Sequence, residues 1–232
     1  SMMIPIEENL AQILESIRQA SDNRKDVKLI AVSKTKPVEL ILRAFKAGQI
    51  SFGENRVQEA RAKSPQLPET VDWHLIGPLQ KNKAKYCPSI FSTIHTLHNL
   101  EVAQLLSKKC QEKNSYLNVL IQMNLSGEET KSGLRTHDEL KQLADQIIEL
   151  PNIKLTGLMT IGDPGLNDLG NQKIFARLRE LLNSESARLG LKDQIVELSA
   201  GMTSDYQLAL KEGATLIRVG SAIFGERFKV KN

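Results

Sequence analysis

Short apolar runs alternate with amphipathic helical stretches along almost the whole chain, and this alternation limits the folds that it can adopt. Runs rich in aliphatic and β-branched residues predict strands at 29–32, 50–53, 72–76, 90–94, 117–123, 153–159, 195–199 and 215–219. Apolar residues at helical spacing predict a leading helix at 6–20. The same spacing between the strands predicts helices at 38–47, 55–63, 79–86, 100–113, 138–150, 172–189 and 204–211. The pattern predicts an α/β fold, a single closed (β/α)8 barrel of the TIM type with an extra N-terminal helix. A doubly wound open sheet would show the same periodicities.

The composition fits one globular domain. The 232 residues are 41% hydrophobic and 25% charged, and no linker rich in Pro, Gly or Ser divides them. We expect one domain over 1–232, with Ser1 a remnant of expression and about 226–232 a C-terminal tail. No apolar stretch has membrane-spanning length and no leader pattern is present, so we expect a cytoplasmic protein. Cys87 and Cys110 lack metal-ligand spacing and are expected to stay reduced.

Lys34 stands where the first predicted strand ends. Pro37 cannot extend a strand and suits the first turn of a helix, so Lys34 falls in the connecting loop. Ligands bind at this edge of parallel α/β folds, and a partly shielded lysine there favours the neutral amine, which can attack a carbonyl. Lys34 is therefore a candidate for Schiff-base chemistry. The alternative is that Lys34 and Lys36 are solvated loop cations.

The last two predicted strands end in segments that suit phosphate binding. Gly220 follows the eighth strand and permits close backbone approach, while the next helix offers unpaired N–H groups. Hydroxyls and another glycine follow the seventh strand, at Ser199, Gly201 and Thr203. Barrel phosphate sites often lie after strands seven and eight, which favours an anion site here. The alternative is ordinary turns with a helix cap at Ser204 or Asp205.

Three further polar residues each have two interpretations. Arg218, if it points into the barrel, needs a partner, which is either a carboxylate such as Glu197 or Glu54 or a ring nitrogen of a ligand. Asn55 either caps the next helix or belongs to a site. His74 is either a core histidine whose ring nitrogens are hydrogen-bonded or an acid or base. Alone, none of them establishes a site.

Motifs spread over nearly the whole chain carry a family resemblance. They are AVSKTKP (31–37), FGEN (52–55), WHLIG (73–77), LQKNK (79–83), SG (132–133), GLM (157–159), LSAGM (198–202) and RVGSAIFG (218–225). In this order the segments closely resemble those of the pyridoxal phosphate homeostasis proteins, a family related to the N-terminal barrel domain of alanine racemase.

The resemblance implies a site for pyridoxal 5′-phosphate as cofactor. By resemblance, Lys34 holds it as an internal aldimine and Arg218 lies near the pyridine nitrogen. The segments that match the phosphate-binding ones contain Ser199, Gly201, Thr203 and Gly220, with Ser221 as a further candidate. Asn55 and His74, from two other matching segments, complete the set of candidate cofactor contacts. The chain departs from the family pattern at Ala200 and Thr203, where methionine and serine are usual, which concerns fine affinity more than binding.

The predicted function is to hold pyridoxal 5′-phosphate reversibly on Lys34 and to buffer or deliver it, without strong catalysis and without a metal. An arginine stays cationic and disfavours a protonated ring nitrogen, which weakens the cofactor as an electron sink. We also expect no counterpart of the β domain that completes the active site of alanine racemase. We expect a monomer that meets apo forms of cofactor-dependent enzymes transiently, and a second cofactor site at Lys36 or Lys131 is left open.

Three other functions fit parts of the sequence. A minimal racemase would need an acid or base opposite Lys34, for which His74 and Tyr206 are weak candidates. An aldolase-like barrel would trap a sugar phosphate on the same lysine. A nucleic-acid or partner-binding module would use Lys81, Lys83 and Lys85, but a net charge of +4 and 4% aromatic residues argue against nucleic acid.

Overall fold

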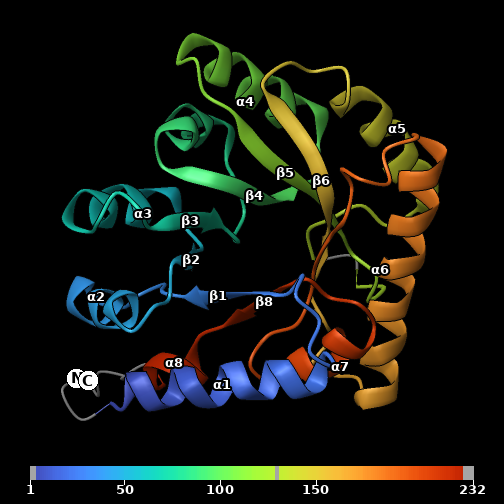
Figure 1. The fold of residues 1–232 in the computed structure, drawn as a ribbon. Helices are drawn as coiled ribbons and strands as arrows, with labels where there is room; N and C mark the ends of the chain where they lie inside the picture. The colour runs from blue at the N-terminus through green and yellow to red at the C-terminus, as the bar shows by residue number, and fades with distance from the viewer. Residues whose placement is uncertain (1–3, 129–130, 227–232) are drawn as a thin grey trace.

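The eight strands of the protein close into a parallel barrel (Figure 1). The computed structural model describes residues 4–128 and 131–226, so Ser1 and residues 227–232 of the expected tail lie outside the described residues. The strands are β1 (Lys28–Val32), β2 (Ser51–Glu54), β3 (Asp72–Leu75), β4 (Phe91–Leu97), β5 (Leu117–Met123), β6 (Ile153–Thr160), β7 (Glu197–Ser199) and β8 (Leu216–Val219). Each strand pairs with the next and β1 pairs with β8, which confirms the predicted barrel.

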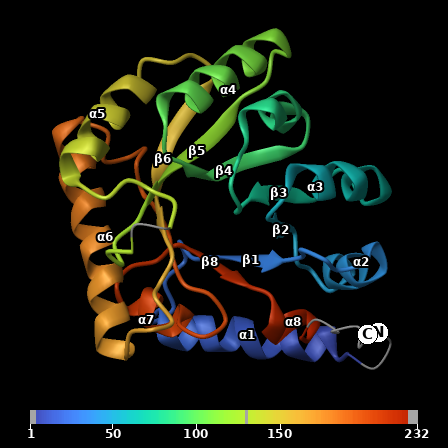
Figure 2. The same ribbon diagram turned by 180° about the vertical axis from the view of Figure 1, so that it is seen from behind.

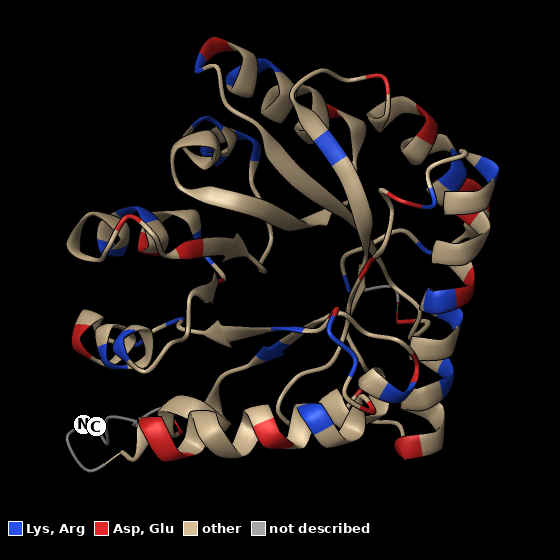
Figure 3. Ribbon diagram, in the orientation of Figure 1, with Lys and Arg blue, Asp and Glu red and all other residues tan. Residues whose placement is uncertain are grey.

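Helices surround the barrel in both ribbon views (Figures 1 and 2). The α-helices are α1 (Ile6–Ala20), α2 (Val38–Lys46), α3 (Val57–Lys63), α4 (Leu100–Glu112), α5 (His137–Ile147), α6 (Asp168–Arg188), α7 (Tyr206–Lys211) and α8 (Ser221–Phe224), with 3₁₀ helices η1 (Ser64–Gln66) and η2 (Lys81–Ser89). The extra helix α1 packs against α2, α7 and α8. Charged residues of both signs are spread over the outer helices (Figure 3). None of the helices within 4–128 and 131–226 is both long enough and apolar enough to cross a membrane.

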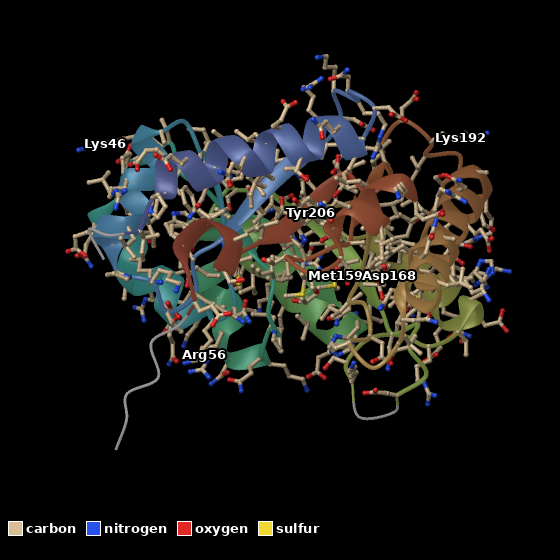
Figure 4. All side chains as sticks on the ribbon, turned by 90° about the horizontal axis from the view of Figure 1, so that it is seen from below. Lys46, Arg56, Met159, Asp168, Lys192 and Tyr206 are labelled. Carbon is tan, nitrogen blue, oxygen red and sulfur yellow. The ribbon has the colours of Figure 1, made fainter. Side chains whose placement is uncertain are left out.

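Apolar side chains form two layers. The larger layer lies between strands and helices and includes Phe52 and Ile217, while a small cluster fills the barrel with Ile30, Leu120, Met159 and Leu216. Met159 lies near the middle of the structure, whereas Lys46 and Lys192 extend from its edge (Figure 4). Strands with both faces covered in this way require continuous apolar runs, which explains the sequence pattern. Cys87 and Cys110 are both buried, and no disulfide joins them.

Two expectations about helices are wrong. An α-helix is expected over 79–86, but the structure has the 3₁₀ helix η2, which contains Pro88. Pro88 has no N–H to donate to Ala84, and it disfavours the α conformation of Cys87, so the segment could not continue as an α-helix to its end at Ser89. Helix α3 begins at Val57 with Arg56 at its N-cap, so Asn55 does not cap it.

Gly157 on β6 yields a prediction about stability. A Cβ at this position would lie 1.9 Å from the carbonyl oxygen of Glu197, its partner on β7. Gly157→Ala should push the two strands apart and lower the free energy of unfolding by about 1–3 kcal/mol or more, measured by urea unfolding. Gly165→Ala is the matched control, because its Cβ would meet only the side chain of Asp163, at 3.1 Å. Equal stability of the two variants would contradict the prediction.

Candidate functional site

A cavity of about 470 Å³ opens beside the carboxyl ends of β1, β2 and β8. Its lining consists of Val32, Lys34, Thr35, Lys36, Asn55, Arg56, Glu59, Gly220, Ser221 and Gly225. The side chain of Lys34 is exposed, rather than partly shielded as the sequence interpretation assumed. The size suits a small molecule, and the cationic lining side chains outnumber the one carboxylate.

Charged side chains of α3 hold the turn that carries Lys34. Lys63 Nζ donates to the carbonyl oxygen of Ser33 at 2.8 Å, and the N–H of Thr35 donates to Glu59 Oε2 at 2.5 Å. The two peptide groups that flank Lys34 are therefore both fixed by α3. Thr35 has a φ of 64°, a left-handed conformation that threonine rarely adopts, so the turn needs such support.

Glu54, the last residue of β2, lies behind this turn and is fully buried. It accepts a hydrogen bond from the Ser33 hydroxyl, and its Oε2 lies 3.1 Å from Lys63 Nζ. Burial raises the pKa of Glu54 to about 7, although the bonds from Ser33 and Lys63 oppose the shift. We call Glu54, Glu59 and Lys63 the turn clamp.

The negative charge of the turn clamp lies mainly on Glu59. Burial disfavours ionisation of Glu59, but hydrogen bonds from Lys63 and from the N–H of Thr35 outweigh it and lower the pKa of Glu59. Sequence reasoning missed Glu59 and Lys63. Their i, i+4 spacing in the predicted helix that follows the second strand was the available signal.

The opposite wall of the cavity is the segment that follows β8. Gly220 and Ser221 line it, and the N–H of Gly220 donates to Thr203 Oγ1 at 3.4 Å, which joins the segments after β7 and β8. A Cβ on Gly220 would lie 3.2 Å from Cβ of Val32 on β1, so glycine allows the two strand ends to approach. The structure thus brings the segments of Lys34, Thr203, Gly220 and Ser221 together.

Ser199 and Gly201 do not face this cavity. Gly201 has a φ of 99°, and a Cβ there would lie 2.8 Å from Cα of Tyr206, so the turn before α7 requires glycine. Ser199 is buried inside the barrel, where its hydroxyl contacts His95 and Arg218. Direct contact of either residue with a phosphate stays a prediction.

Arg218 points into the barrel from β8 and is almost fully buried. It donates to Ser199 Oγ and, at 3.1 Å, to the carbonyl oxygen of Thr160. Of the two alternatives for Arg218, pairing with a carboxylate such as Glu197 or Glu54 is therefore wrong. Burial lowers the pKa of Arg218 to about 10, which leaves the guanidinium charged at neutral pH.

The structure brings Asn55 to the Lys34 cavity but not His74. His74 is buried on β3, contacts Asp72 and His95, and lines a separate cavity of about 400 Å³ at the amino-terminal ends of the strands. A histidine whose two ring nitrogens are both engaged at that end of the barrel matches the interpretation as a core residue.

The two alternative lysines lie in different places. Lys36 lines the Lys34 cavity and donates to the carbonyl oxygen of Gly225 at 3.1 Å. Lys131 lines another cavity, of about 260 Å³, together with Gln122 and Ser132.

Within the described ranges, no group of three or more His, Cys, Asp or Glu side chains could hold a metal ion.

Comparisons with known proteins agree over nearly the whole chain. The family described as "Alanine racemase, N-terminal domain" matches residues 7–228. The "Pyridoxal phosphate homeostasis protein" of Pasteurella multocida is 44% identical, covering 96% of this chain and 97% of its own length, and that of Escherichia coli is 39% identical, covering 97% and 98%.

Solved structures extend the comparison. The structure of PipY of Synechococcus elongatus without PLP is 36% identical to this chain and has a TM-score of 0.88, and the match covers 95% of this chain and all of PipY. The structure of PipY with PLP bound has a TM-score of 0.85. Alanine racemase of Clostridium difficile is 17% identical with a TM-score of 0.73, and the match covers 96% of this chain and 57% of the racemase, which shows a shared fold.

The raised pKa of Glu54 predicts how stability depends on pH. Folding favours protonated Glu54, because its pKa rises from 4.5 to about 7. The stability this provides is fully present below pH 4.5 and is lost as the pH rises through about 7, by up to about 3 kcal/mol. Glu54→Gln should therefore flatten the dependence of the unfolding free energy on pH between about pH 5 and 8, measured by urea unfolding. Glu8→Gln, exposed on α1, should keep the original profile, and identical profiles in both variants would refute the assignment.

Proposed function

The chain belongs to the pyridoxal phosphate homeostasis protein family, and we propose that it binds pyridoxal 5′-phosphate (PLP) and holds it reversibly as a Schiff base on Lys34. The observation that carries the proposal is the cavity that joins the exposed amine of Lys34 to the glycine segment after β8. PipY, a relative in fold and sequence, has been solved with PLP bound.

The amine of Lys34 is suited to a reversible covalent bond. Its nitrogen adds to the aldehyde carbon, and a C=N bond replaces C=O while the oxygen leaves as water with the two protons of the amine. The turn clamp fixes both peptide groups beside Lys34, so the amine is offered from a defined backbone position. PLP supplies an aldehyde for this bond and a phosphate that the protein can recognise.

The wall opposite Lys34 suits the phosphate. We assign phosphate contacts to Gly220, Ser221 and Thr203, whose backbone and hydroxyl groups lie in the joined segments after β7 and β8. Lys36 and Arg56 add positive charge to the same lining. Asn55 is a further candidate contact, whereas the structure gives no support for His74.

Arg218 favours holding PLP over transforming an amino acid. We place Arg218 near the pyridine nitrogen, where a cation disfavours a protonated ring and weakens electron withdrawal. A racemase also needs an acid or base opposite Lys34, and neither of the two candidates, His74 and Tyr206, lies in the Lys34 cavity. His74 lies at the other end of the barrel, and the Tyr206 hydroxyl donates to Ser16 Oγ on α1 at 2.8 Å. We propose that the protein buffers PLP in the cytoplasm and passes it to apo enzymes transiently.

Replacement of Lys34 tests the covalent bond. Lys34→Ala should lose the yellow chromophore and the borohydride-reducible adduct that the unmodified protein forms with PLP, measured by absorption and peptide mass mapping. Lys36→Ala and Lys131→Ala are the matched controls and should keep an adduct on Lys34. An adduct of unchanged yield in Lys34→Ala would move the bond to another lysine. An adduct with a sugar phosphate but none with PLP would favour the aldolase alternative.

Gly220 tests the phosphate end. Gly220→Leu places a bulky side chain against Val32 and in the lining of the cavity, so PLP should bind at least about tenfold more weakly, equal to about 1.4 kcal/mol. A spectroscopic titration measures the affinity, and thermal unfolding verifies that the variant is folded. Unchanged affinity in a folded variant would remove this segment from the site.

A further inference from the structure

A second cavity, of about 370 Å³, lies beside the cavity of Lys34. The two cavities share Asn55 and Arg56 in their linings, so they meet at the segment that follows β2. The second cavity is also lined by Gln80 and Lys83 of the LQKNK motif (79–83), to which the proposed function gives no role. We call this second cavity the side cavity.

Close packing of two strand ends builds the side cavity. The N–H of Ile76 donates to the carbonyl oxygen of Glu54 at 3.0 Å, which holds the end of β3 against the end of β2. A Cβ on Gly77 would lie 2.2 Å from the carbonyl oxygen of Asn55, so this approach of the two segments requires glycine. The Thr96 hydroxyl donates to the carbonyl oxygen of Gly77 at 2.7 Å. Backbone contacts therefore hold the side cavity in shape.

The side cavity is lined by cations and amides, and no carboxylate lines it. Its polar side chains are those of Asn55, Arg56, Gln58, Gln80 and Lys83. Lys83 is half-buried, and Arg56 is exposed and lies away from Met159 in the interior (Figure 4). Over residues 4–128 and 131–226, neither Arg56 nor Lys83 forms an ion pair, whereas Lys63 on α3 is held by two carboxylates. Two cations without such partners give the side cavity a positive potential that attracts an anion.

The carboxylate in the lining of the Lys34 cavity does not cancel this potential. Glu59 accepts from the N–H of Thr35 at 2.5 Å and forms an ion pair with Lys63, so its charge is already balanced. Lys34, Lys36 and Arg56 line the same cavity. An anion at the junction of the two cavities therefore meets a lining that is net positive.

The order of the strands separates the side cavity from the wall assigned to the phosphate. Strand β1 pairs with β8 on one side and with β2 on the other, so the turn of Lys34 lies between the segments that follow β8 and β2. The phosphate contacts assigned to Gly220 and Ser221 lie on the β8 side, whereas Arg56 lies on the β2 side. An anion in the side cavity therefore does not compete with the phosphate.

We propose that the side cavity binds the carboxylate of an amino acid whose amine enters the Lys34 cavity and displaces Lys34 from PLP. Arg56 and Lys83 pair with the carboxylate, and the amides of Gln58 and Gln80 supply further N–H donors. Because Arg56 lines both cavities, a molecule whose carboxylate is bound there carries its amine into the cavity of Lys34. The inference rests on the proposed function, since it concerns the bond that Lys34 forms.

The displacement needs no further reactant. The nitrogen of the amino acid adds to the carbon that is bound to Lys34 Nζ, and two hydrogens move from the incoming nitrogen to the leaving one. A C=N bond to the amino acid replaces the C=N bond to Lys34, and nothing is oxidised or reduced. Lys34 returns as a free amine. Occupation of the side cavity therefore favours release of the cofactor from its covalent bond.

Two matched ligands test the inference in the PLP-loaded protein. L-alaninamide has the amine of L-alanine without its carboxylate, so only L-alanine can use the side cavity. The preference for L-alanine over L-alaninamide in displacing Lys34 should fall by about tenfold in the double variant Arg56→Gln, Lys83→Gln. Absorption and the borohydride-reduced adduct left on Lys34, found by peptide mass mapping, measure the displacement. The ratio between the two ligands cancels any change in PLP affinity.

Lys85→Gln is the matched control. It removes a positive charge from the same 3₁₀ helix, outside the linings of both cavities, and should keep the preference of the unmodified protein. The same preference in the double variant and in the unmodified protein, with the adduct on Lys34 in both, would overturn this inference alone.

A measurement without PLP separates the side cavity from the proposed function. Propionate, a carboxylate without an amine, should shift the backbone N–H signals of Gln58, Gln80 and Lys83 in NMR spectra of the cofactor-free protein, whereas propionamide should not. Equal shifts with both compounds, or none with propionate, would overturn the inference even if PLP binds to Lys34. Shifts with propionate but no adduct with PLP would overturn the proposed function, and with it the displacement of Lys34, and would leave a carboxylate site.

Discussion

The pairing of β1 with β8 closes the barrel, and the candidate site depends on it. In this ladder Ala31 lies opposite Val219, so the turn with Lys34 and the segment with Gly220 leave the barrel side by side. The residues are almost two hundred positions apart in the chain, and no local preference could bring them together. Closure needs strands covered on both faces, which the apolar runs and the outer helices provide. The chemistry at the carboxyl ends is therefore a consequence of the packing of the whole barrel.

The inside of the barrel is more polar than its outer layer. Four apolar residues form a cluster there, and His74, His95, Ser199 and Arg218 are buried polar residues of the strands. Buried polar groups destabilise a fold unless each has a partner. Here His74 contacts His95, His95 contacts Ser199, and Arg218 donates to Ser199. A buried guanidinium bound to a hydroxyl and a carbonyl is less stabilised than one bound to a carboxylate, which agrees with the lowered pKa of Arg218. The interaction of Arg218 with the charge of Asp205 opposes the effect of burial but does not outweigh it.

Sequence reasoning predicted what depends on local pattern and missed what depends on contacts between distant strands. The strands, the leading helix and the position of Lys34 at a strand end follow from apolar periodicity and from Pro37. The sequence pattern could not identify the hydrogen-bond partners of Arg218, because strand alternation indicates only which face of the strand a residue lies on. A carboxylate partner was therefore one of two alternatives. The sequence does not single out His95, because one histidine in an apolar strand does not indicate a polar contact. Its contacts with His74 and Ser199 appear only when the strands are assembled. Asn55 and His74 each lie in a motif that matches the family, yet Asn55 follows the carboxyl end of β2, whereas His74 lies within β3 and lines the cavity at the amino-terminal ends of the strands.

The exposure of Lys34 bears on the difference between a carrier and an enzyme. A carrier has to release what it binds, and a Schiff base that water or an incoming amine can reach is readily reversed, whereas a closed site would protect it. The protein places its structural constraint in the backbone of the turn, through Glu59 and Lys63, and leaves the side chain of Lys34 open to the cavity. Binding then gains from a fixed geometry without the loss of access that burial of the lysine would cause. An exposed lysine on a turn that α3 holds, in a cavity also lined by Gly220, agrees with the proposal that the protein holds an aldehyde cofactor and gives it up.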